Sequence, residues 1–294
     1  MSDENLAEIR NEKAKKIQHP KGKLTAYERL NLLLDEGSFS EIDQHVASDE
    51  NPEGEAVITG TGTIHGRPVF VFSEDFSVMG GSLGEVVAKK ILKIMDHALE
   101  ARAPIIGIKD SGGARIQEGI SSLFGYAQIF KKNVEASGKV PQISVVVGPS
   151  AGGAVYSPAL TDFIFQVKDI GQLYVTGPAV VKTVTGEDVT FEELGGVEAH
   201  GTKSGVTHQV CETEEQAFEE IRYLMSFLPQ SSSQKPPMFI TEDEPSRVIE
   251  SLDSFIPENR NQPYDMEKII LDIVDDGEHY PIQSNYATNI ITSF

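Results

Sequence analysis

Two pairs of adjacent glycines mark places where the backbone itself could do chemistry. The first pair lies in SGGAR at 111–115, after the apolar run 104–110, and the second lies in GPSAGGAVYSP at 148–158, after the apolar run 142–148. Each run is typical of a short buried strand, and each pair precedes a pattern typical of a helix. Such a unit leaves unpaired N–H groups at the helix start, and glycine lets a ligand approach them closely.

Two such turns on successive units predict a site in which two N–H groups face one oxygen atom. Gly113 and Ala114 would supply one donor, and Gly152 and Gly153 the other. This is the arrangement of an oxyanion hole, where one donor contributes roughly 3 kcal/mol in the transition state. We expect the helix that starts near Ile116 to add its positive dipole end. We also expect Gly153→Val to block the site and leave the fold intact, unless the glycines only form tight turns.

Ser150 leaves a different chemistry open. GPSAG at 148–152 matches Gly-x-Ser-x-Gly, the nucleophile elbow of serine hydrolases. The acids and histidines that could complete a triad in chain order are Asp162, Asp169, His200 and His208. The two histidines have no cysteine or carboxylate at ligand spacing, so a metal site is not predicted.

Composition excludes several classes of protein. The 294 residues include 25 Lys and Arg against 45 Asp and Glu, a net charge of −20. This charge argues against a nucleic-acid binder and against docking on an anionic membrane. Cys211 is the single cysteine, which rules out an intrachain disulfide and a cysteine-based zinc site. No apolar run is long enough for a membrane span, and 1–16 has no apolar secretory signal, so we expect a cytoplasmic protein.

The elements that must position the turns follow from hydrophobic spacing. We expect a helical arm over 1–23, then a helix capped by Thr25 and Glu28 and ended by Gly37. A hairpin is expected at 60–66 and a strand at 66–75. Helical and strand-like segments then alternate: 83–102, 104–110, 116–136, 142–148, 151–161, 162–167 and 172–177. The helical spacing in 116–136 runs through Ile116, Ile120, Leu123, Ala127, Phe130 and Val134. This alternation predicts an α/β fold with strands covered on both faces.

The end of the chain repeats its beginning. The segment 28–42 aligns with 267–282, so that Asp-Glu-Gly at 35–37 falls on Asp-Asp-Gly at 275–277, and 56–61 then falls on 289–294. A chance amphipathic helix with an acidic stop is one interpretation; a two-copy architecture is the other. A Ser/Pro/Gln linker at 229–237 and an acidic stretch at 239–294 favour a domain over 1–240, followed by a linker and the start of a second domain over 241–294.

These motifs, in this order, resemble the carboxyltransferase (β) subunits of biotin-dependent acyl-CoA carboxylases, of the propionyl-CoA carboxylase type. The matching stretches are 22–43, 60–85, 110–119, 148–163, 175–196 and 200–208. The resemblance implies a crotonase-like fold of ββα units, with two copies per chain, of which the N-terminal copy holds acyl-CoA and the C-terminal copy carboxybiotin. Active sites would then form across a dimer between opposite copies. The sequence would be the N-terminal half, complete in its first copy and ending as the second begins.

Three departures from that pattern are visible. Tyr27 and Ser150 stand where relatives often carry Arg and Cys, at positions not expected to touch the reacting atoms. A four-cysteine zinc ribbon is absent, which favours the propionyl or broad acyl-CoA branch. The chain stops at Phe294, where the second copy would enter its core.

The resemblance also implies a reaction. Carboxybiotin on a separate carrier would donate CO2 to the α carbon of propionyl-CoA or acetyl-CoA, through an enolate held by the backbone at Gly113, Ala114, Gly152 and Gly153. Residues implied to position CoA are Ser111, Gly112, Arg115, Ala151, Tyr156 and Gly177. Implied partners are a biotin carboxyl carrier or biotin carboxylase subunit, a polypeptide with the C-terminal half, and further copies in a homo- or hetero-oligomer between dimer and hexamer. A non-catalytic assembly subunit is the alternative.

Overall fold

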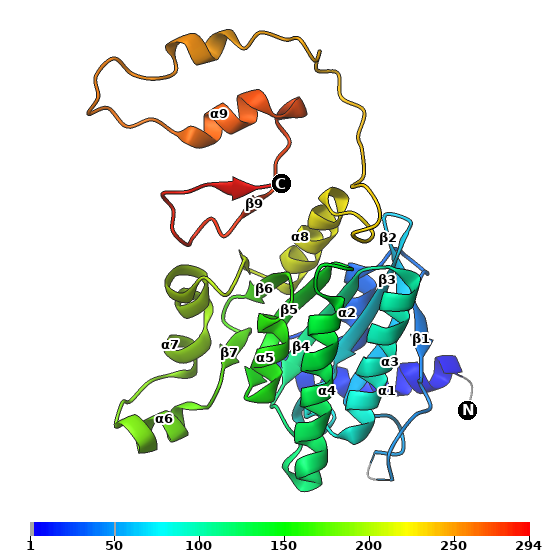
Figure 1. Cartoon of the computed structure of the whole chain (residues 1–294). Coiled ribbons are helices and arrows are strands. Elements are labelled where there is room, and N and C mark those ends of the chain that lie inside the picture. The colour runs from blue at the N-terminus through cyan, green and yellow to red at the C-terminus, as the bar shows by residue number, and fades with distance from the viewer. Residues whose placement is uncertain (1–2, 50) are drawn as a thin grey trace.

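A computed structural model describes residues 3–49 and 51–294, and Figure 1 shows the chain. Its main sheet runs in the order β1-β2-β3-β4-β5-β6-β8, and β7 also pairs with β5. The first three strands are antiparallel neighbours, and every later pairing is parallel. The strand bounds are β1 Ser40–Ile42, β2 Val57–Ile64, β3 Arg67–Glu74, β4 Ile105–Ser111, β5 Gln142–Ala151, β6 Phe163–Val167, β7 Gln172–Tyr174 and β8 Gln209–Cys211.

Helices cover both faces of the sheet, as the sequence predicted. In Figure 1, α3, α4 and α5 lie over one face, while α2 and α8 lie behind it. The helix bounds are α1 Asp3–Gln18, α2 Ala26–Leu33, α3 Glu85–Ala101, α4 Ile120–Ala136, α5 Gly153–Ala159, α6 Pro178–Thr185, α7 Phe191–Gly195, α8 Glu214–Phe227 and α9 Met266–Ile273. Within the described residues, no helix is both long enough and apolar enough to cross a membrane.

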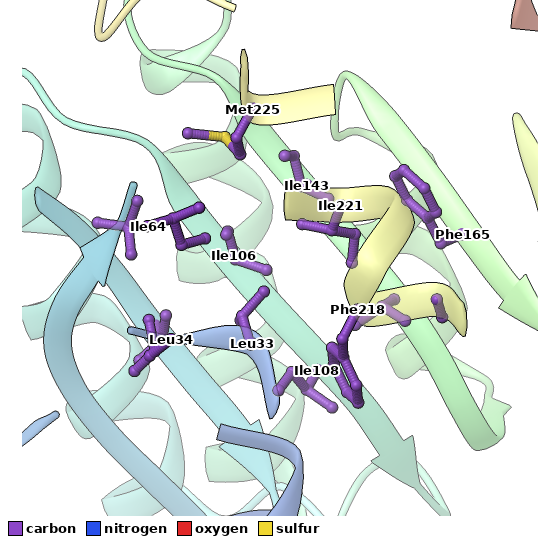
Figure 2. Packing of buried hydrophobic residues seen from close by; sticks show 14 of the residues in the cluster. Leu33, Leu34, Ile64, Ile106, Ile108, Ile143, Phe165, Phe218, Ile221 and Met225 are labelled. Atoms are coloured by element: carbon purple, nitrogen blue, oxygen red, sulfur yellow. The ribbon is translucent and has the colours of Figure 1, made fainter. Parts of the chain in front are cut away.

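The face under α2 and α8 holds the larger core. Figure 2 shows side chains from these helices meeting the sheet: Leu33, Phe218, Ile221 and Met225 against Ile106, Ile108, Ile143 and Phe165. The capping box at Thr25 and Glu28 is present, so α2 begins as predicted. It ends earlier than predicted, at Leu33, because Leu34 is extended; Gly37 instead takes a positive φ of 69° in the turn that follows.

Helix α4 corrects the prediction for 116–136 in two ways. It begins at Ile120, after a separate 3-10 turn over Ile116–Glu118. The predicted apolar spacing does not mark the buried face, since Ile116 is 89% exposed, Ile120 82% and Leu123 62%. The residues of α4 that are buried are Ser122, Gly125, Tyr126, Ile129, Asn133 and Ala136. Four of these six residues are small or polar, and Gly125 lets α4 approach α3 closely, while the apolar side chains of Ile120 and Leu123 stay uncovered.

The sequence repeat has a structural counterpart. Helices α2 and α9 each have eight residues and end in an extended residue. The hairpin of β9 (Pro281–Ile282) and β10 (Thr292–Ser293) pairs Ile282 with Thr292, as β1 and β2 pair Ile42 with Thr59. In both pairs the threonine hydroxyl donates a hydrogen bond to the isoleucine carbonyl, at 2.8 Å from Thr59 to Ile42 and at 2.9 Å from Thr292 to Ile282. The proposed domain division at 240 stays a prediction.

Candidate functional site

The two glycine turns meet at the carboxyl end of the central strands. Strands β4 and β5 are parallel neighbours, and Ser111 pairs with Ser150 where they end. A Cβ built on Gly113 would lie 2.6 Å from the carbonyl oxygen of Ala151, so the backbones of the two turns are in direct contact. The two turns therefore meet, and their action on a single oxygen atom stays a prediction.

Two backbone N–H groups of the glycine turns are hydrogen-bonded within the protein, and two are not. The Gly113 N–H donates to the Ser111 hydroxyl at 3.1 Å, and the Gly152 N–H donates to the Tyr174 carbonyl at 3.1 Å. No bond to another described residue is made by the N–H of Ala114 or of Gly153. Of the four residues predicted to stabilise an oxyanion, Ala114 and Gly153 thus keep a free donor.

A third glycine, which the sequence analysis missed, has the same backbone conformation as Gly152. Gly119 precedes α4 with φ 54° and ψ −121°, and Gly152 precedes α5 with φ 56° and ψ −118°. Neither helix has a side-chain cap, so the N–H groups of both first turns lack the usual capping acceptor. The sequence did offer a signal for Gly119, because a glycine directly precedes the helical pattern there, although it is not part of a Gly-Gly pair.

Arg115 is engaged within the protein, and its predicted role in positioning CoA stays a prediction. Its side chain is 1% exposed and forms ion pairs with Glu55 at 2.8 Å and with Glu118 at 2.9 Å. Burial lowers the pKa of Arg115, but these two carboxylates outweigh burial and raise it. Glu118 also accepts the Glu85 N–H at 2.6 Å, at the start of α3. Arg115 and Glu118 therefore hold the first turn to its neighbours.

Ser111 is also engaged within the protein. It is fully buried, and its hydroxyl donates to the Gly81 carbonyl at 2.6 Å while it accepts the Gly113 N–H. These two bonds fix the shape of the turn and leave the hydroxyl without access to a ligand.

The other residues predicted to position CoA are only partly brought together. Gly112 is exposed, and Ala151 is partly exposed at the meeting point of the turns. Tyr156, on α5, is 45% exposed and packs edge-on against Phe130. Gly177 lies at the start of α6, which extends away from the sheet in Figure 1.

Beneath the turns lies a buried charge network that the sequence analysis missed. The Asp110 carboxylate, at the end of β4, accepts hydrogen bonds from Lys23 at 2.6 Å, Arg29 at 2.9 Å and Gln18 at 3.0 Å. Arg29 also donates to Glu214 of α8 at 2.6 Å. The network ties α1, α2 and α8 to the strand that carries the first turn. In the sequence, Asp110 lies two positions before the Gly-Gly pair at 112–113, and this proximity was the available signal.

The geometry does not support the hydrolase alternative. The Ser150 hydroxyl is buried and has no hydrogen-bond partner among the described residues. His208 accepts the Ile164 N–H and His200 bonds to the Leu173 carbonyl, so neither activates Ser150. Over the part of the chain that the structure describes, no three His, Cys, Asp or Glu side chains gather as a metal site.

Comparisons with known proteins give the relatives of this chain. The model of the carboxyl transferase domain matches residues 17–294. The propionyl-CoA carboxylase beta chain of Roseobacter denitrificans is 54% identical over 94% of this chain and 56% of its own length. The methylmalonyl-CoA decarboxylase subunit alpha of Veillonella parvula is 53% identical over 99% of this chain and 59% of its own length. The human mitochondrial propionyl-CoA carboxylase beta chain is 52% identical.

A solved structure gives the same result for the fold. The transcarboxylase 12S hexamer, crystallised with methylmalonyl-coenzyme A, superposes with a TM-score of 0.93 at 44% identity, over 99% of this chain and 60% of that chain. The α/β fold is therefore the crotonase-like fold of the carboxyltransferases. The chain spans a little over half the length of the curated relatives it matches.

Proposed function

The chain belongs to the carboxyl transferase domain family, and from that premise we propose that it forms the acyl-CoA side of a biotin-dependent carboxyltransferase. The observation that carries the proposal is the contact between the two glycine turns, which brings the free N–H groups of Ala114 and Gly153 to one edge of the sheet. Two such donors are suited to stabilise an oxygen atom that gains negative charge during a reaction.

The proposed substrate is a short acyl-CoA, propionyl-CoA or acetyl-CoA. Its thioester oxygen would accept hydrogen bonds from the Ala114 and Gly153 N–H groups, which strengthen as the α carbon loses its proton and the enolate forms. The uncapped start of α5 adds a positive dipole end at the same place. A side chain at position 113 would disturb this arrangement, because glycine alone allows the approach to Ala151.

Carboxybiotin, delivered by a separate carrier protein, would supply CO2 and accept the α proton. The residues of the two turns fit this proposal, because they offer backbone N–H donors and no side-chain base. Ser150 is buried, and the side chains of Arg115 and Ser111 are engaged within the protein. The proposed partners are a biotin carboxyl carrier or biotin carboxylase subunit and the C-terminal carboxyltransferase copy. We place the reaction in the cytoplasm.

The uncovered face of α4 supports assembly into an oligomer. Four apolar side chains are each more than 60% exposed: Ile116 in the 3-10 turn before α4, and Ile120, Leu123 and Phe124 at the start of the helix. Contiguous exposed apolar surface of this kind marks protein–protein contacts. We propose that this stripe is covered when the chain assembles.

Calorimetric titration tests the proposal directly. Propionyl-CoA should bind the purified chain with micromolar affinity and more tightly than CoA alone, because only the thioester offers an oxygen to the turns. Carboxyl transfer from biotinylated carrier should appear only after a polypeptide with the C-terminal copy is added. If acyl-CoA does not bind in the presence of that copy either, the chain is an assembly subunit and the proposal is wrong.

A further inference from the structure

Leu83, just before α3, holds the first turn through its backbone. The Leu83 N–H donates to the Gly113 carbonyl at 2.9 Å, and the Arg115 N–H donates to the Leu83 carbonyl at 2.9 Å. These bonds flank Ala114 on both sides and leave its own N–H free. The Leu83 side chain is 2% exposed, so it is anchored in the core.

Two consecutive residues of α4 connect Leu83 to the second turn. A Cβ on Gly125 would lie 3.0 Å from Leu83 Cδ2 and 2.7 Å from Ala88 Cβ, so α4 approaches α3 as closely as glycine allows. The next residue, Tyr126, lies against the second turn: a Cβ on Gly153 would lie 2.5 Å from Tyr126 Cδ2. The Gly125–Tyr126 step therefore stands between the two groups that carry the free donors.

The contact at Tyr126 is made by its ring. The side chain is 4% exposed, and its hydroxyl has no hydrogen-bond partner among the described residues. The ring is held by Gly153 on one side and by Phe130, whose centroid lies 5.9 Å away, on another. Close-packed rings of this kind transmit position, because the interior cannot be compressed. This contact also corrects the expectation for Gly153→Val, which would collide with a buried ring and disturb the packing of α4 on α5.

We propose that Tyr126 is a positioning residue whose ring sets the separation of the Ala114 and Gly153 N–H groups. The chain of contacts runs from the first turn through Leu83 and Gly125–Tyr126 to Gly153, and every link is a close contact or a backbone hydrogen bond. The inference rests on the proposed function, because it gives that separation a purpose: both donors must reach one thioester oxygen.

The test compares three variants of the chain. Tyr126→Leu removes the ring and Tyr126→Phe keeps it. Ile129→Ala removes a buried side chain about one turn further along α4, as a control for general loosening of the helix. Each is titrated with propionyl-CoA and with its S-propyl thioether, which lacks the carbonyl oxygen. The C=O stretch of bound, carbonyl-labelled propionyl-CoA is recorded by infrared difference spectroscopy.

Tyr126→Leu should bind propionyl-CoA at least tenfold more weakly, with thioether binding changed less than twofold and the carbonyl stretch returned toward its value in water. Tyr126→Phe and Ile129→Ala should keep the wild-type preference for the thioester. If Tyr126→Leu keeps both the preference and the carbonyl shift, the inference is wrong while the proposed function stands.

The chemical shifts of backbone amides test the role of Tyr126 even if no acyl-CoA binds the wild-type chain. In that event the proposed function fails, but the geometric part is still measurable in the free protein. The Gly152–Ala154 amide signals should move in Tyr126→Leu by more than the loss of the tyrosine ring current accounts for, and should stay close to their wild-type positions in Tyr126→Phe and Ile129→Ala. Unmoved signals in Tyr126→Leu would show that the ring does not position the turn.

Discussion

Gly113 lies directly against the carbonyl oxygen of Ala151, and a Cβ at position 113 would be 2.6 Å from that oxygen. The two residues belong to turns that follow different strands and lie 38 positions apart in the chain. Their contact makes one site out of two local features, because neither turn can shift without moving the other.

Replacing Gly113 by alanine should therefore damage both turns. Its φ of +98° is a conformation that alanine avoids, and the new Cβ would collide with backbone. Strain of this kind costs about 1–3 kcal/mol in unfolding free energy. Propionyl-CoA binding, measured by calorimetry, should weaken at least tenfold.

Gly138→Ala is the matched control for that change. Gly138 also has a positive φ, +70°, but a Cβ there meets nothing within 4 Å. It should lower the unfolding free energy by about 1 kcal/mol, from backbone strain alone, and leave acyl-CoA binding unchanged. Equal binding losses in the two variants would argue that the Gly113 contact has no special role.

Asp110→Asn should be strongly destabilising. The carboxylate is fully buried between Lys23 and Arg29, so its loss leaves two buried cations without their shared partner. Breaking a buried pair in this way costs about 3–5 kcal/mol. Urea unfolding followed by circular dichroism measures the loss. Asp96→Asn, which breaks the exposed pair with Lys132, should cost no more than about 1 kcal/mol.

Asp35 should make stability depend on pH below about pH 4. Burial alone would raise the pKa of Asp35, but hydrogen bonds from the Gly66 N–H, Thr63, Arg222 and the His65 N–H outweigh it and hold the pKa well below its ordinary value.

The sign follows from that direction. Because the folded protein binds this proton less readily than the unfolded chain, the stabilisation is complete above the unfolded pKa of about 3.9 and is lost as the pH falls. Thermal unfolding between pH 6 and pH 3 measures it. Asp35→Asn should be less stable than wild type at pH 6, with the difference shrinking toward pH 3; a constant difference would contradict the assignment.

The apolar stripe on α4 should govern association and not folding. Ile120→Glu combined with Leu123→Glu replaces two exposed side chains, so the unfolding free energy should change by less than about 0.5 kcal/mol. Sedimentation velocity should show weaker association than wild type. Lys131→Glu, at an exposed position of the same helix, should leave association unchanged. A double variant that associates normally would place the interface elsewhere.

Ser150 should be inert toward hydrolase reagents. Its buried hydroxyl has neither a base nor an open approach, so a fluorophosphonate probe should not label the protein. Labelling that disappears in Ser150→Ala would revive the hydrolase alternative.

Local order along the chain determined much of the fold in advance. The capping box at Thr25, the apolar strands and the helical spacing of 83–102 depend on neighbours in sequence, and the structure forms each of them. The glycine turns were also visible, because a strand, two glycines and a helix occur within one short segment. The likeness of 28–42 to 267–282 predicted a second copy of the opening segment, and the structure adds that the hairpins of the two segments share a register.

Tertiary structure alone decided which of those groups remain free to act. Whether an N–H is available depends on a partner distant in sequence, such as the Tyr174 carbonyl that engages Gly152. Arg115 was predicted to position a ligand, and only the fold shows that Glu55, 60 positions away in the chain, pairs with it. The buried face of α4 was misread because hydrophobicity does not reveal which side of a helix a neighbour covers. Residue types set the possible chemistry, but the packing of distant segments selects the atoms that can perform it.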